Sequence, residues 1–104
     1  MTVAFACDMT AIPPEERSVH HALIYRLMSE ALTEIRDLPD GLAFRFPAEE
    51  YEAVTRFVAN ERLCCPFLRF TLDVAPYRGP LWLNLTGAEG VQAFIRAELP
   101  LPDA

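Results

Sequence analysis

The stretch that decides the fold runs from Phe67 to Thr86 and reads FLRFTLDVAPYRGPLWLNLT. Two apolar series occupy every second position in it: Leu68, Phe70, Leu72 and Val74, then Leu81, Leu83 and Leu85. Alternation of this kind is typical of strands with one buried and one solvated face. The Pro- and Gly-containing segment 75–80 between them has the composition of a turn. We therefore expect an antiparallel hairpin, in which Trp82 faces away from the leucines and is either covered by a loop or available to a partner.

The segments just before this hairpin predict a strand followed by a helix. Leu42 to Phe46 alternate after the strong turn sequence Asp37 to Gly41, and Pro47 ends the expected strand. From Ala48 to about Cys64, apolar residues recur at helical spacing, and Pro66 marks the end of the helix.

Three more elements are predicted toward the two ends of the chain. A long helix is expected from about Glu15 to Arg36, because apolar residues recur at helical spacing throughout it. The alternation from Thr2 to Cys7 suggests a short strand. Thr86 and Glu89 have the spacing of a capping box that would begin a final helix.

The expected fold is α+β, a two-layer sandwich with the order β-α-β-α-β-β-α in a single domain, 1–104. Because a helix joins them, strands 42–46 and 67–75 should run parallel with a right-handed crossover if they share a sheet. We therefore expect a mixed sheet that is covered by helices on one face.

Composition excludes several functions. The 104 residues are 52% hydrophobic, and nine basic against fifteen acidic residues give 9 − 15 = −6. All basic residues are Arg, so chemistries that need a lysine amine are excluded. The excess of acidic residues disfavours binding to nucleic acid. No apolar run approaches the ~20 residues that a membrane span needs. We expect a cytoplasmic location with reduced thiols, although a bond from Cys7 to Cys64 or Cys65 stays open.

The second helix brings chemically active side chains to its apolar side. A rotation of ~100° per residue places Glu61, Cys64 and Cys65 along that side. His20 lies on the apolar arc of the first helix, and Cys7 shares a strand face with apolar residues, so all five side chains could point into one layer. Three thiols with a carboxylate or imidazole form a ligand set for a soft or borderline ion such as zinc, copper or mercury.

Other interpretations of these residues remain open. Adjacent cysteines depart from the usual C-x₂₋₄-C spacing of zinc sites, and free cysteine often serves only as core filler. A redox role is disfavoured at a helix C-terminus, where the dipole opposes a thiolate. Glu61 could instead pair with Arg62 or Arg69, and the His20–His21 pair could lie on the helix surface. Sulfur separations of ~3.5 to 4 Å would support a shared site.

Three segments resemble a family of small bacterial proteins of uncharacterised activity: residues 38–47 (LPDGLAFRFP), 61–70 (ERLCCPFLRF) and 82–87 (WLNLTG). The family signature is E-R-x-C-C-P-F, matched by residues Glu61, Arg62, Cys64, Cys65, Pro66 and Phe67. The resemblance covers roughly the C-terminal two-thirds of the chain, and it also implies that Cys7 corresponds to an N-terminal cysteine of the family. Members are sometimes encoded near metal-responsive regulators and metal-resistance genes, which implies metal handling.

The leading hypothesis is a non-enzymatic, thiol-dependent binder of a soft metal or metalloid ion. Its ligands would be Cys64, Cys65 and Cys7, with Glu61 or His20 completing or orienting the site. The alternative is an interaction or ligand-binding domain in which the cysteines are structural and the Trp82 hairpin meets a protein partner or a second copy. A peroxide- or thiol-exchanging enzyme that uses Cys64 or Cys65 is the third possibility, whereas no hydrolase triad can be assigned.

Overall fold

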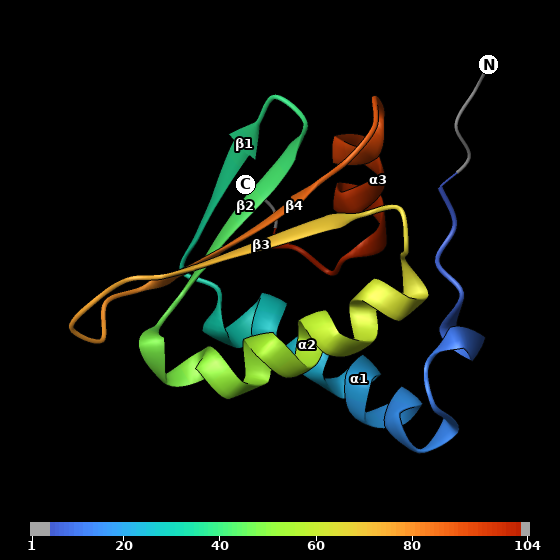
Figure 1. Ribbon diagram of the computed structural model, residues 1–104, viewed down its shortest axis with the longest axis horizontal. Coiled ribbons are helices and arrows are strands. Elements are labelled where there is room, and N and C mark those ends of the chain that lie inside the picture. Colours follow the sequence, from blue (N-terminus) through green and yellow to red (C-terminus); the bar gives the residue numbers. More distant parts are fainter. Residues whose placement is uncertain (1–4, 103–104) are drawn as a thin grey trace.

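The computed structural model describes residues 5–102, which form a four-stranded sheet and three α-helices (Figure 1). The strands are β1 (Glu34–Leu38), β2 (Gly41–Phe46), β3 (Arg69–Val74) and β4 (Leu81–Thr86), in the spatial order β1-β2-β4-β3. Every pair of neighbours is antiparallel. The α+β class is therefore confirmed, but the expectation of a mixed sheet is wrong. Strands β2 and β3 do run in the same direction, yet β4 lies between them, so they form no parallel pair.

The hairpin predicted from residues 67–86 is present as β3 and β4. Its register pairs Phe70 with Leu85 and Leu72 with Leu83. In β4 the three leucines are buried and the residues between them are partly exposed, as the alternation predicts. One face of the hairpin therefore contributes to the core and the other meets solvent.

The helices are α1 (Pro14–Arg26), α2 (Tyr51–Cys64) and α3 (Val91–Glu98). A 3₁₀ turn, η3 (Ala48–Glu50), leads into α2, so the predicted helix from Ala48 to Cys64 is present over its whole length. The main core combines side chains of the helices with the inner face of β2 and β4: Leu27, Met28, Leu42, Phe44, Phe46, Val54, Phe57, Leu81, Leu83, Leu85, Val91 and Ile95. No helix in residues 5–102 has the length and hydropathy needed to cross a bilayer.

The first helix is shorter than predicted, and a strand takes its place. Helix α1 passes into one π-helical segment, η2 (Leu27–Ala31), and the chain becomes extended at Leu32. Thr33 then donates its amide to the Arg45 carbonyl at 2.9 Å, and β1 follows. Ile35 fits a helical stripe and a strand face equally well. The turn at 37–41 was the missed signal, because a hairpin turn before β2 requires a strand on its other side.

The predicted final helix is present as α3, but its predicted start is wrong, and the described part of the expected first strand is not a strand. Residues 2–4 of the expected first strand lie outside the described residues, and Phe5 to Cys7 form no strand. The ring of Phe5 instead packs on Phe67 and Phe94, with centroids 5.0 and 5.6 Å away. The capping box is absent because Thr86 is committed to β4, so α3 begins after Gly90, whose φ is 94°. The observed order is α-β-β-α-β-β-α.

Trp82 lies on the outer face of the sheet and is partly covered. The guanidinium carbon of Arg36 on β1 sits 4.4 Å from the centre of the indole ring. This cation–π contact covers the ring with a side chain of β1. The sequence predicts instead either a covering loop or a surface that is open to a partner. The strongly exposed aromatic side chain at this end of the sheet is Tyr77, in the β3–β4 turn.

Candidate metal centre

The C-terminal end of α2 presents three chemically active side chains to one buried region. Glu61, Cys64 and Cys65 are 4%, 2% and 1% exposed. Helical geometry stops at Cys65, where φ is −121° and ψ is 73°, although its amide still donates to the Glu61 carbonyl at 2.7 Å. Adjacent helical residues would point ~100° apart, so this change of backbone direction allows both sulfurs to face inward.

The segment before α1 closes over this helix end. The amide of Asp8 donates to the Cys64 carbonyl at 2.9 Å, which satisfies one of the free carbonyls at the end of α2. Ile12 is buried against Cys64 and Cys65 in a small apolar cluster of its own. Arg17 of α1 donates to the carbonyls of Met9 and Ile12 at 3.1 and 3.0 Å. The segment therefore holds its place without belonging to the sheet.

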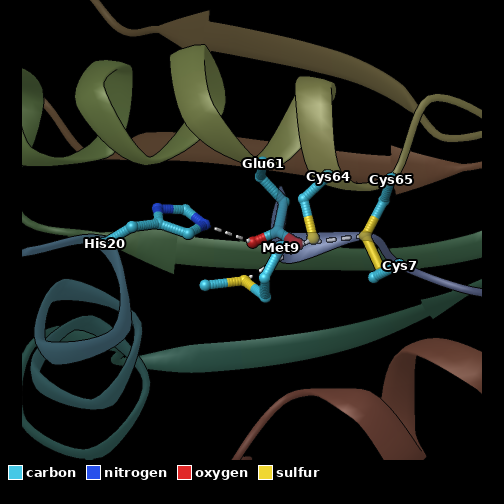
Figure 2. Close-up of a disulfide and its surroundings, with 6 residues drawn as sticks. All are labelled: Cys7, Met9, His20, Glu61, Cys64 and Cys65. Carbon is cyan, nitrogen blue, oxygen red and sulfur yellow. Dashed lines mark hydrogen bonds and ion pairs between the residues drawn. A yellow bond between two sulfur atoms is a disulfide. The ribbon is translucent and has the colours of Figure 1, made fainter. Parts of the chain in front are cut away.

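Cys7 and Cys65 form a disulfide, and Cys64 is a buried free thiol (Figure 2). The positions of the cysteines in the sequence allow this bond, although we expect reduced thiols from composition. Glu61 lies beside the three sulfurs, and one ligand atom from each of these four residues lies within 4.8 Å of all the others. The spatial cluster that the residue pattern predicted is therefore present, and in this structure two of its sulfurs are bonded to each other.

Glu61 connects the sulfurs to His20. Its Oε2 accepts from Nε2 of His20 at 3.0 Å, and its Oε1 lies 3.1 Å from Sγ of Cys65. A disulfide sulfur has no hydrogen, so the second contact becomes a thiol hydrogen bond only when Cys65 is reduced. Nδ1 of His20 has no hydrogen-bond partner among residues 5–102. Glu61 therefore pairs with His20, and not with Arg62 or Arg69 as the alternative interpretation held.

The environment of Cys64 suppresses its ionisation. Burial, and next the charge of Glu61, raise the pKa of the Cys64 thiol from 9.0 to about 11. A thiol of this kind is a poor nucleophile at neutral pH, which argues against the thiol-exchanging enzyme. It is compatible with metal binding, because a cation displaces the proton from a coordinating thiol.

Solvent reaches this cluster through a pocket of about 370 Å³. Glu61 and Cys64 line its inner part, and Met9, His21, Tyr25 and Glu98 are among its other lining residues. An ion could therefore enter on the side of Cys64, whereas neither cysteine of the disulfide lines this pocket. His21 is exposed, so the two neighbouring histidines have different environments, one buried and one at the surface.

The structure brings four of the five predicted residues into direct proximity, namely Cys7, Glu61, Cys64 and Cys65. His20 joins them through Glu61. Met9 is not among the predicted site residues, yet its Sδ lies 3.8 Å from Sγ of Cys64. Its position two residues after Cys7 was the available signal, but that signal has meaning only once Cys7 is known to approach α2.

Fold and site together define a small α+β domain with a buried cluster of sulfur and carboxylate ligands. Comparison of the chain with protein-family models, curated proteins and solved structures gave no match. The resemblance to the E-R-x-C-C-P-F family therefore stays a prediction. The geometry of the site is the remaining guide to the function of this protein.

Proposed function

We propose that the reduced protein binds one soft metal or metalloid ion through the thiolates of Cys7, Cys64 and Cys65 and a carboxylate oxygen of Glu61. The observation that carries this proposal is the mutual distance of at most 4.8 Å between these four ligand atoms. Three sulfur donors select a thiophilic ion, such as Zn²⁺, Cu⁺ or Hg²⁺, over Mg²⁺ or Ca²⁺. The implied genomic setting of the resembling family points the same way.

His20 acts on this site as a positioning residue. Metal-bound carboxylates are held by outer hydrogen bonds, and the 3.0 Å contact from Nε2 of His20 leaves Oε1 of Glu61 facing the sulfurs. His20 therefore orients the ligand without needing to touch the ion.

The Cys7–Cys65 disulfide makes metal binding dependent on redox state. A dithiol reductant donates two electrons and two protons to this bond, which yields two thiols and the oxidised reductant. On metal binding, the thiols then release their protons to solvent. In the oxidised state only Cys64 of the three cysteines remains a free thiol. A reducing compartment such as the cytoplasm would keep the site competent, so a cytoplasmic location is part of the proposal.

The test is metal stoichiometry after equilibration of the purified protein with Zn²⁺, Cu⁺ or Hg²⁺ and removal of free ion. We expect one tightly bound ion per reduced chain and much weaker retention after oxidation. Cys64→Ser/Cys65→Ser should lose the ion, and Glu61→Gln should weaken its binding. Glu50→Gln is the matched control, because Glu50 pairs with Arg26 at 2.7 Å outside the cluster. Unchanged stoichiometry in the double cysteine variant would overturn the proposal.

A second candidate function is protein interaction at the β3–β4 turn. Tyr77 is fully exposed there and Val74 is 52% exposed, and exposed aromatic residues are enriched at interfaces. We propose a second copy of the chain as the partner. Light scattering during size-exclusion chromatography should then detect a dimer that Tyr77→Ser disrupts. A strict monomer across concentrations would contradict this candidate and leave the metal proposal unaffected.

A further inference from the structure

Met9 adds a fourth sulfur to the cluster, outside the disulfide. Its Sδ is 3.8 Å from Sγ of Cys64, and Figure 2 shows the two side chains pointing toward each other from η1 (Met9–Ala11) and α2. Two sulfurs bound to one tetrahedral ion with metal–sulfur bonds of ~2.3 Å would be ~3.8 Å apart. The Cys64 thiol donates to the Met9 thioether at this separation, which also matches the sulfur–sulfur distance around a shared ion.

The backbone holds Met9 at this position. Its carbonyl accepts from Nε of Arg17 at 3.1 Å, and the preceding amide, of Asp8, is bonded to the Cys64 carbonyl at 2.9 Å. Met9 is 37% exposed at the mouth of the 370 Å³ pocket, whereas Cys64 is buried at its inner end. An incoming ion can thus meet the thioether first and the thiol next.

The chemistry of this pair discriminates between ions. A thioether is an uncharged, soft donor that is typical of copper(I) sites, whereas structural zinc sites use thiolate, imidazole and carboxylate. One thiolate and one thioether with Cu⁺ give a neutral assembly. A ligand atom of Glu61 lies within 4.8 Å of Sγ of Cys64, and its carboxylate would balance the second charge of Zn²⁺, so the soft thioether and not the net charge favours Cu⁺.

We propose that Met9 and Cys64 form an entry site for monovalent copper, which stays available while the Cys7–Cys65 disulfide is closed. This inference rests on the proposed function only for the next step, in which the ion passes to the full set of thiolates after reduction. It also narrows the class of ion from soft metals in general to copper(I).

The test is an anaerobic titration of the oxidised protein with Cu⁺ in competition with a chromogenic copper(I) chelator. Mass spectrometry before and after the titration verifies that the disulfide is intact. Met9→Leu, which keeps the apolar volume and removes the sulfur, should weaken Cu⁺ binding by about tenfold, equivalent to about 1.4 kcal/mol. Met28→Leu is the matched control, because Met28 is buried in the main core away from the site.

The Cys7→Ser/Cys65→Ser variant provides a second protein for the test, in which the Cys7–Cys65 disulfide cannot form. Cu⁺ should still bind to it, and X-ray absorption should count one sulfur ligand fewer after Met9→Leu is added. Equal Cu⁺ affinity with and without the Met9 sulfur in oxidised protein would overturn the entry site. Reduced wild-type protein that binds Cu⁺ no more tightly than oxidised protein, and retains no other soft ion, would instead overturn the proposed function, so the two failures are distinguishable.

Discussion

His20 and Glu61 form a buried pair, with Nε2 of the imidazole 3.0 Å from Oε2 of the carboxylate and both side chains almost inaccessible to solvent. His20 belongs to α1 and Glu61 to α2, and the two residues are 41 positions apart in the sequence. The pair therefore joins the two helices and sets the direction of the carboxylate that faces the sulfurs.

Replacing both members of this pair should cost less stability than the sum of the two single replacements. His20→Leu leaves a buried carboxylate without its partner, so we expect the free energy of unfolding to fall by about 3 kcal/mol. The double variant His20→Leu/Glu61→Leu should lose clearly less than the sum of the two single variants. Urea denaturation of the four proteins measures the difference.

A surface ion pair supplies the control for that cycle. Arg56 and Glu16 join the same two helices at 2.7 Å, but half of the Arg56 side chain is exposed. Arg56→Leu should therefore cost less than about 1 kcal/mol. A similar decrease in the free energy of unfolding for Arg56→Leu and His20→Leu would mean that burial does not make the His20–Glu61 pair more important than a surface pair.

The disulfide should stabilise the oxidised protein because it closes a long loop. Cys7 and Cys65 are 58 positions apart. Cys7→Ser should therefore lower the free energy of unfolding by about 2 to 4 kcal/mol, since the unfolded chain regains the entropy of that loop. Urea denaturation without reductant measures this loss. Under reducing conditions the variant and the wild type should unfold at nearly the same urea concentration, and a persistent gap would point to packing of Cys7 instead.

The stability of the protein should fall at alkaline pH because of Cys64. Its pKa is raised from 9.0 to about 11 in the folded state, so the unfolded chain loses this proton first. Between these two values the unfolded state binds fewer protons, and the free energy of unfolding decreases as pH rises. Urea midpoints of oxidised protein from pH 8 to 10.5 measure the slope, and Cys64→Ala should make it shallower. The same slope in both proteins would mean that another group is responsible.

The ionisation of Cys64 can also be followed directly. In oxidised protein it is the free thiol, so alkylation by iodoacetamide reports on it alone. The rate should continue to rise up to a pH near 11, because only the thiolate reacts. A rate that levels off near neutral pH would restore the thiol-exchanging enzyme as a candidate.

Trp82 offers a fluorescence probe of the outer face of the sheet, because it is the only tryptophan in the chain. Arg36→Gln removes the guanidinium that lies 4.4 Å from its ring centre, so acrylamide should quench the fluorescence more strongly. The loss of stability should stay at or below about 1 kcal/mol for a cation–π contact of this exposure. Arg69→Gln, an exposed arginine on β3, is the control and should leave quenching unchanged.

The strength of each local pattern explains which parts of the fold could be predicted. The β3–β4 hairpin and α2 have clear periods of 2 and 3.6, so their residues alone indicate them. Residues 34–36 continue the helical period of α1 equally well, and pairing with β2 decides that they belong to β1. Phe5 to Cys7 alternate like a strand, but the aromatic contacts of Phe5 and the Asp8–Cys64 hydrogen bond place them at the end of α2 instead.

The residues at the candidate site divide in the same way. Glu61 and Cys64 lie three positions apart at the end of one helix, so the sequence by itself determined that a carboxylate and a thiol would share its buried side, with a second thiol next to them. Only the tertiary structure decided that Cys7 bonds to Cys65 and leaves Cys64 free, that His20 pairs with Glu61, and that Met9 faces Cys64. The physical reason is range. Helical geometry relates residues three or four positions apart, whereas these contacts span 41 to 58 positions and depend on how the core packs the segments together.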